Sequence, residues 1–199
     1  MFYQLKGKMA SKPTTDLDSQ IKVGDLPLTF KVKYIGSEVA TGLWGIKYTR
    51  RPVEILVKVA KSLPVDEALP QCNLKVSTEG VSIDILTPES KARSWKHPID
   101  TISYGVQDLV YTRVFAMIVV KDEQHPHPFE VHAFVCDSRA VTRKLTFALA
   151  AAFQDYSRRI KESGEQSKTD NITPQRQKFA IDLRTPEELQ EGANEETEA

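Results

Sequence analysis

The residues best suited to chemistry are few and widely separated in this sequence. His125 and His127 are close enough to share a metal ion, but each precedes a proline in a charged turn, and no carboxylate or thiolate completes a ligand set. A solvated loop accounts better for this pair. Cys72 and Cys136 are not at metal-ligand spacing and are too few for a disulfide framework, which is typical of a reducing compartment. We therefore expect no metal site and no cofactor.

Motifs of catalysis are missing as well. The sequence has no glycine-rich phosphate loop, no GxSxG nucleophile turn and no HExxH metal motif. Its carboxylates are scattered through turns and the C-terminal region, where such groups normally keep a surface soluble. An enzyme would need a catalytic site assembled without any local motif. We therefore expect that the protein is not an enzyme.

The charge of the chain limits the partners that it can have. Its 27 basic and 27 acidic residues cancel, but residues 165–199 hold nine acidic and four basic residues, which leaves 18 acidic and 23 basic residues in 1–164. This surplus fits anionic headgroups and is too small for a nucleic-acid-binding surface. The first ten residues lack the apolar core of a signal peptide, and no stretch approaches the ~18 apolar residues of a membrane span. We expect a cytoplasmic protein.

Sequence patterns divide the chain into three parts. Residues 1–25 are polar, and we expect a disordered leader. Residues 26–164 carry the hydrophobic periodicity and are long enough for one domain. Residues 165–199 are expected to be a disordered acidic tail with one apolar island at 179–183. The segment 179–188 is either a motif that recognises a second protein, or an island that occurs by chance or folds back on the domain.

Hydrophobic periodicity predicts the secondary structure of the central part. Apolar residues alternate with lysines from Phe30 to Ile35, as in a half-buried strand. Pro52 suits a first helical turn, and apolar residues follow it at helical spacing. The predicted elements are a strand at 30–35, a helix at 52–63, a β-hairpin at 74–85, a strand at 101–106, a second hairpin at 114–135 and a helix at 138–160. This order predicts an α+β, mainly β fold: a small orthogonal sandwich or barrel whose open end the last helix closes.

Five sequence blocks, in this order, resemble the phosphotyrosine-binding (PTB/PID) domains of the Disabled, Numb and LDL-receptor-adaptor branch. They are Phe30 to Gly36 (FKVKYIG), His97 to Tyr104 (HPIDTISY), Arg113 to Ala116 (RVFA), His132 to Cys136 (HAFVC) and Ala152 to Gln154 (AFQ). The resemblance covers residues 26–162 and includes a helix after the first strand. It implies a PH-like seven-stranded orthogonal sandwich capped by the C-terminal helix, with that extra helix.

The resemblance also implies a binding site. In such domains an Asn-Pro-x-Tyr peptide from a receptor tail adds as an antiparallel strand to the fifth strand, and its turn rests against the C-terminal helix. By position, the backbone of Ile102, Ser103, Tyr104, Gly105 and Val106 would pair with the peptide, and Phe153 would contact its turn.

Packing offers another role for most of these side chains. The alternation places Ile102, Tyr104 and Val106 on one face, where they would fill the core, and leaves Ser103 and Gly105 on a nearly bare second face. The site therefore concerns the backbone and the Ser103 hydroxyl. Phe153 is about 40° around the helix from Leu149, on the flank of the apolar stripe, and a peripheral core position is its alternative role.

A second class of function is a membrane-recruitment module that binds phosphoinositide headgroups without a peptide ligand. The resemblance places such a site on the first strand and first helix, and a solvated cationic face is the alternative. The acidic stretch Val65-Asp66-Glu67 departs from the family pattern and weakens the lipid hypothesis. The basic residues concerned are Lys31, Lys33, Lys47, Arg50, Arg51, Lys58 and Lys61.

Phosphate recognition is a separate question. Arg113, Arg139 and Arg143 could bind a phosphotyrosine by their chemistry, because a guanidinium pairs with phosphate in bidentate fashion. None of them matches a known phosphate-binding position of the family, and the Disabled-like character favours unphosphorylated tyrosine.

Overall fold

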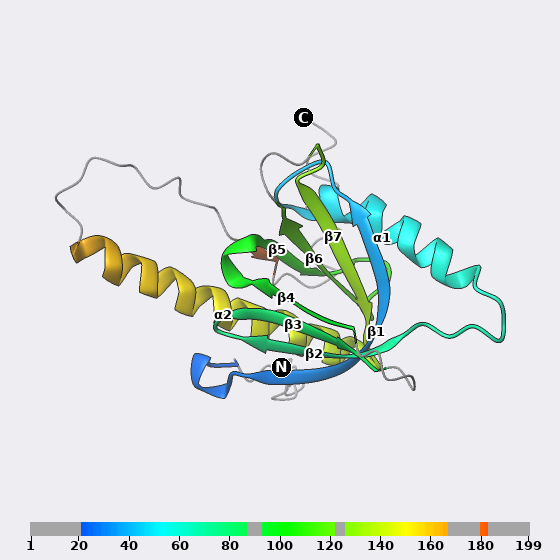
Figure 1. The fold of residues 1–199 in the computed structure, drawn as a ribbon, viewed down its shortest axis with the longest axis horizontal. Helices are drawn as coiled ribbons and strands as arrows, with labels where there is room; N and C mark the ends of the chain where they lie inside the picture. The colour runs from blue at the N-terminus through cyan, green and yellow to red at the C-terminus, as the bar shows by residue number, and fades with distance from the viewer. Residues whose placement is uncertain (1–20, 87–92, 122–125, 167–179, 183–199) are drawn as a thin grey trace, which may run out of the picture.

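The computed structural model describes residues 21–86, 93–121, 126–166 and 180–182. Figure 1 shows a strongly bent antiparallel sheet with one helix beside β1 and β7 and a longer helix, which contacts β2, β5 and β6. The seven antiparallel strands are β1 (Leu28–Val39), β2 (Gln71–Ser77), β3 (Gly80–Ile85), β4 (Ser94–Pro98), β5 (Ile102–Gln107), β6 (Val114–Val120) and β7 (Phe129–Val135). The other elements are α1 (Ile46–Lys61), α2 (Arg139–Gln166), the 3-10 turns η1 (Val23–Asp25) and η2 (Ile99–Thr101), and a short strand β8 (Ala180–Asp182). The predicted fold class is confirmed.

The long strand β1 joins the two halves of the sheet. Its first half pairs with β2, from Leu28 opposite Val76 to Lys33 opposite Gln71, and its second half pairs with β7. The register shifts between Tyr34 and Gly36, and Gly36 has a φ of 134°, which an L side chain rarely adopts. This irregularity bends β1, so that β2, β3 and β4 fold over the strands on its other side.

Two hydrophobic clusters lie on opposite faces of the sheet. The larger cluster joins β2 and β3 to β6, β7 and α2, and Leu74, Phe115 and Leu149 are all fully buried in it. The smaller cluster lies beneath α1 and includes Val53, Ile118 and Val131, each also fully buried. Because β6 sends alternate residues into the two clusters, it is covered on both faces.

Helix α1 begins earlier than its sequence predicts. Pro52, expected in the first turn, lies inside the helix and is buried, and Gly45, with a φ of 109°, precedes the first helical residue. A proline within a helix lacks the N–H that would bond four residues back, which makes it a poor signal of this position. Contact of the helix with the sheet compensates, because Val53, Leu56 and Val57 bury their side chains there.

Aromatic and titratable side chains pack between β4 and the β1–β7 pair. The imidazole rings of His97 and His132 are 4.6 Å apart, and the rings of Tyr34 and Trp95 are 5.5 Å apart. The Tyr34 hydroxyl lies 3.1 Å from Nδ1 of His132. Burial lowers the pKa of His132 to about 4, with the neighbouring His97 acting in the same direction. Both imidazoles are therefore best accommodated in their neutral form.

Two structural expectations concern metals and membranes. Within the described residues, no group of three or more potential ligands is arranged to hold a metal ion. No helix in that part of the chain is long and apolar enough to cross a membrane. His125 and residues 1–20 of the expected leader (1–25) lie outside the described residues, whereas residues 21–25 are described and include η1.

Candidate functional site

Strand β5 is the last of the seven antiparallel strands, so within these strands it pairs with a neighbour on one edge only, its inner edge. That edge pairs with β6, with Tyr104 opposite Ile118, Gly105 opposite Met117 and Val106 opposite Ala116. Its outer edge pairs with β8, which forms the last strand in the order β4-β3-β2-β1-β7-β6-β5-β8. Parallel pairs join Tyr104 to Ala180, Gly105 to Ile181 and Val106 to Asp182. The outer edge is thus a surface on which an extended segment can hydrogen-bond.

Helix α2 forms the side of this edge, and specific contacts hold it there. The Gln107 side-chain amide donates a hydrogen bond to the carbonyl oxygen of Thr112 at 2.5 Å and also lies 3.4 Å from that of Arg139, the first residue of α2. The Ser138 hydroxyl accepts a hydrogen bond from the N–H of Val141 at 3.2 Å and so caps the first turn. Both β5 and β8 contact α2. The end of β5 and the start of the helix are therefore fixed relative to each other.

The alternation predicted for β5 is interrupted by a β-bulge. The register with β6 shifts between Ile102 and Tyr104, so that the extra residue, Ser103, turns the rest of the strand over. Ile102 packs in the larger cluster with α2, whereas Tyr104 and Val106 pack in the smaller cluster beneath α1. The prediction that the three side chains share one face is wrong. Their role in the core is confirmed.

Ser103 does not lie on a bare face. It is 5% exposed, and its hydroxyl donates to the carbonyl oxygen of Leu43 at 2.6 Å and also lies 3.4 Å from that of Ile118. These partners hold the bulge and the loop before α1 together. Because the hydroxyl is already bonded within the domain, it is poorly placed to contact a peptide. Gly105, which alternates with Tyr104 and Val106, lies on the α2 face of β5.

Phe153 is more buried than its position on the flank of the helix suggests. Its side chain is 6% exposed and belongs to the same cluster as Leu149, which is fully buried. Removing the ring would therefore cost stability, and any contact of Phe153 with a peptide remains a proposal.

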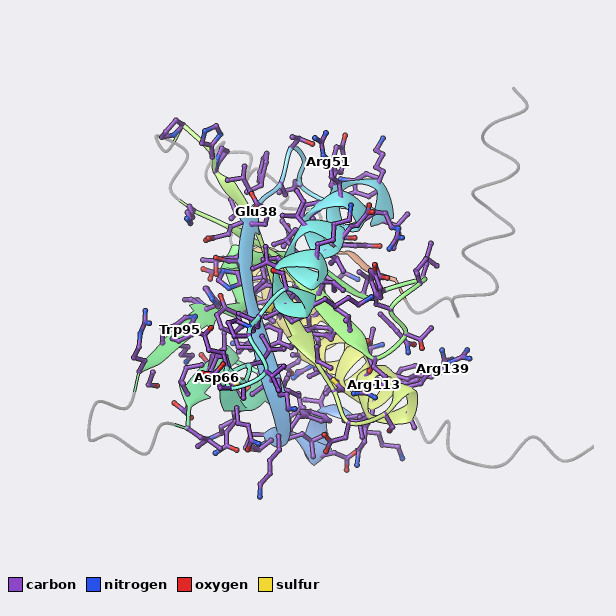
Figure 2. All side chains as sticks on the ribbon, turned by 90° about the vertical axis from the view of Figure 1, so that its right-hand side faces the viewer. Glu38, Arg51, Asp66, Trp95, Arg113 and Arg139 are labelled. Carbon is purple, nitrogen blue, oxygen red and sulfur yellow. The ribbon has the colours of Figure 1, made fainter. Side chains whose placement is uncertain are left out.

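The seven basic residues predicted for lipid binding lie on β1 and on α1. Figure 2 shows Arg51 near one end of α1 and Asp66 beyond its other end. Several of these residues are engaged within the domain: Arg50 pairs with Asp108 at 3.1 Å, Lys58 with Glu54 at 3.0 Å, and the Lys47 and Lys61 ammonium groups lie over the rings of Tyr48 and Tyr111. Among the described residues, Lys31, Lys33 and Arg51 are exposed and take part in no ion pair.

The three arginines considered for phosphate binding are partly engaged as well. Arg113 donates from Nε to the carbonyl oxygen of Cys136 at 3.2 Å. The Arg143 guanidinium lies 5.0 Å from the centre of the Phe147 ring. Figure 2 shows Arg113 and Arg139 on the same side of the molecule, near the start of α2.

Residues 180–182 belong to the site, although they were expected within a disordered tail. They form β8 on the outer edge of β5, as the fold-back alternative for the apolar island requires. The only signal in the sequence was an apolar run within a polar, acidic region. The rest of the proposed motif at 179–188 lies outside the described residues.

Comparison with known proteins gives one consistent result. A family model described as phosphotyrosine interaction domain (PTB/PID) matches residues 46–162. Human low density lipoprotein receptor adapter protein 1 is 30% identical over 128 residues, which are 64% of this chain and 39% of that protein. Mouse PTB domain-containing engulfment adapter protein 1 is 27% identical over 139 residues, 69% of this chain and 43% of that protein. The chain thus spans less than half the length of these relatives.

A solved structure with a similar fold is the C-terminal phosphotyrosine interaction domain of mouse APBB2. It aligns with a TM-score of 0.50 at 20% sequence identity, over 74% of this chain and 93% of that domain. At this identity the likeness concerns the fold.

Proposed function

Because this chain belongs to the phosphotyrosine interaction domain (PTB/PID) family, we propose that it is a non-enzymatic adaptor that binds a short peptide along the outer edge of β5. The proposed ligand is an Asn-Pro-x-Tyr sequence in the cytoplasmic tail of a receptor, bound without phosphorylation of its tyrosine. The adaptor would link that receptor to trafficking or signalling. It would act in the cytoplasm and reach the inner face of the plasma membrane with its receptor.

The observation that carries this proposal is the pairing of a strand with the outer edge of β5. Residues Tyr104 to Val106 pair there with β8, so the outward-facing backbone groups of this segment are oriented to accept an added strand. Exposed edges are normally protected against such pairing, and an edge that takes a strand is the structural requirement of β-augmentation. The bonded start of α2 beside it supplies a fixed wall for the turn that follows an Asn-Pro pair.

Two further observations support the ligand class. The relatives described above are named as adaptors, one for the low density lipoprotein receptor and one for engulfment, which favours receptor tails as partners. The contacts of Arg113 and Arg143 within the domain favour an unphosphorylated tyrosine, because a phosphate would have to compete for these guanidinium groups.

A titration with synthetic peptides tests this function. A fluorescein-labelled Phe-x-Asn-Pro-x-Tyr peptide should bind the full chain with a micromolar Kd, which corresponds to about −8 kcal/mol. Its phosphotyrosine form should bind no more tightly, and a peptide with Ala-Ala in place of Asn-Pro should bind at least about tenfold more weakly, which is about 1.4 kcal/mol. No binding by several such peptides would refute the proposal.

Variants of two glycines locate the site. Gly105→Val places a β-branched side chain on the buried α2 face of β5, so peptide affinity should fall in the variant protein that remains folded. Gly24→Val is the matched control, because an added Cβ there meets no atom within 4 Å. Equal affinities of the two folded variants would place the groove elsewhere.

A second candidate function is recruitment to phosphoinositide-containing membranes without a peptide. Lys31, Lys33 and Arg51, which are exposed and form no ion pair within the described part of the chain, favour it, whereas the internal contacts of Arg50, Lys58 and Lys61 weaken it. Lipid binding requires neither the outer edge of β5 nor Gly105, so the glycine variants separate the two functions.

A further inference from the structure

Strand β8 occupies the edge on which the proposed function depends. Figure 1 shows this short segment, in orange, beside β5. It pairs with Tyr104, Gly105 and Val106, and it also contacts α2. Residues 180–182 therefore cover both components of the candidate groove.

A strand can add to β5 on one side only. The inner edge of β5 is paired with β6 through the same three residues, from Tyr104 opposite Ile118 to Val106 opposite Ala116. The outward-facing N–H and C=O groups of this segment can bond to one added strand at a time. An incoming peptide must displace β8 before it pairs with residues 104–106.

We propose that residues 180–182 are an intramolecular ligand of this edge, which competes with the peptide and so sets the affinity of the adaptor. The inference rests on the proposed function and adds its regulation. The competing segment is part of the same chain, and its partner is the backbone of β5 rather than a side-chain pocket. Binding of the peptide to β5 therefore requires the release of β8 from the same edge.

The geometry suits a competitor that can be displaced. The pairing is parallel and involves three residues on each strand, whereas parallel pairing is slightly less stable per residue than antiparallel pairing. A longer antiparallel peptide with a turn against α2 would make more contacts. A receptor peptide can therefore displace β8.

The connection to α2 keeps the weak competitor close. Residues 167–179 separate the end of α2 from the start of β8. At about 3.4 Å per residue this connection reaches about 40 Å, which is ample for a return to β5. A short tether gives a local concentration of about a millimolar, so even weak pairing occupies the edge for much of the time. The apparent peptide affinity falls by the fraction of chains in which the edge is free.

Proline substitutions in the full chain test the competition. Ala180→Pro with Ile181→Pro removes two backbone donors from β8 and leaves the length of the tail unchanged. The Kd of the fluorescein-labelled Phe-x-Asn-Pro-x-Tyr peptide should fall by about threefold or more in this variant. Ala193→Pro with Asn194→Pro, which adds the same two prolines outside β8, should bind like the parent. Equal Kd values for the β8 variant and the parent would overturn the competition.

Hydrogen exchange separates this inference from the proposed function. The outward-facing amides within residues 104–106 should exchange faster in the β8 variant than in the parent or the control, whether or not any Asn-Pro-x-Tyr peptide binds. Unchanged exchange would overturn the pairing itself. Faster exchange without peptide binding would support the internal ligand and refute the peptide function.

Sedimentation at several protein concentrations checks that the pairing lies within one chain. The parent and the β8 variant should both be monomeric, with the same exchange difference at each concentration. A parent dimer that dissociates on introduction of the two prolines would show that β8 pairs with a second copy, and would overturn the intramolecular reading.

Discussion

The Arg50 guanidinium in α1 lies 3.1 Å from the carboxylate of Asp108, which is 1% exposed and follows β5. The same carboxylate accepts hydrogen bonds from the N–H groups of Val110 at 2.9 Å and Tyr111 at 2.7 Å. One buried acid thus fixes the turn between β5 and β6 and joins it to the helix on the other face. These contacts fix the end of β5, at one end of the candidate groove, from the face of the sheet that α1 covers.

Loss of this acid should destabilise the domain. Asp108→Ala leaves two N–H groups and one guanidinium without their acceptor, which should lower the free energy of unfolding by about 3 kcal/mol in urea titrations. Arg50→Ala should also destabilise, because it leaves the carboxylate buried without its counter-charge. Arg51→Ala, next to it but exposed, should change stability by less than about 0.5 kcal/mol. Similar effects of the two arginine variants would contradict this account.

Two variants distinguish the role of Phe153 in the core from its proposed contact with the peptide. Phe153→Leu keeps most of the buried volume, so the free energy of unfolding should fall by about 1.5 kcal/mol or less. If the aromatic ring contacts the peptide turn, the Kd should nevertheless rise by at least about tenfold. Leu149→Ala, at a fully buried position, should do the reverse, with a stability loss of about 2–5 kcal/mol and an unchanged Kd in the folded fraction. Parent-like binding by Phe153→Leu would assign the ring to the core.

Stability should decrease as the pH falls below neutrality. Burial lowers the pKa of His132 to about 4, against about 6.5 in an unfolded chain, so the unfolded state binds a proton first. The stability due to neutral His132 is fully present above about pH 6.5 and is lost as the pH falls towards 4, a change on the order of 3 kcal/mol. His97, whose pKa burial also lowers, changes stability in the same direction.

Urea titrations between pH 7.5 and 5 measure this effect while limiting the contribution of Glu130, the carboxylate that faces His132. Burial opposes ionisation of Glu130, but hydrogen bonds from Lys121 and Ser37 bring its pKa below the usual value. His132→Gln should flatten the pH dependence, since glutamine keeps a polar group near the Tyr34 hydroxyl but does not titrate. A parent-like slope in this variant would exclude His132 as the main cause.

Membrane binding should depend on the lysines of β1. Vesicles that contain phosphatidylinositol 4,5-bisphosphate should recruit the full chain weakly, and added salt should abolish recruitment because exposed charges are screened. Lys31→Glu with Lys33→Glu should prevent recruitment, whereas Lys144→Glu with Lys161→Glu, an equal charge change on α2, should not. Recruitment that survives the first pair would exclude β1 as the lipid surface.

Most of the fold could be predicted because its signals are local. Two β-rich runs located β6 and β7 within the predicted hairpin at 114–135, and helical spacing from Leu145 to Tyr156 located α2. The tight turn before Gly80 is equally local, because Gly80 has a φ of 129°, which an L side chain rarely adopts. Such positions admit few residue types, so they can be recognised from the sequence.

The start of α1 and the facing of β5 needed the tertiary structure. Pro52 is a helix-start signal in isolation, and only the contact of α1 with the sheet stabilises a turn and a half of helix before it. In β5, a bulge at Ser103 depends on a hydrogen bond to Leu43, sixty residues away, and it sends Tyr104 and Val106 to the opposite face from Ile102. Long-range partners of this kind leave no periodic trace in the sequence.

The sequence by itself determined the fold class, the family resemblance and the position of the strand that a peptide would join, because each depends on residue types at fixed spacing. Only the tertiary structure decided what lies on that strand. The apolar run in the tail is compatible with several partners. It pairs with Tyr104, Gly105 and Val106 through backbone groups, and because every residue carries these groups, the sequence gives no signal for this pairing. The strand edge that accepts such a segment is the one whose N–H and C=O groups have no partner in the folded sheet. Which edge this is depends on how the whole sheet assembles.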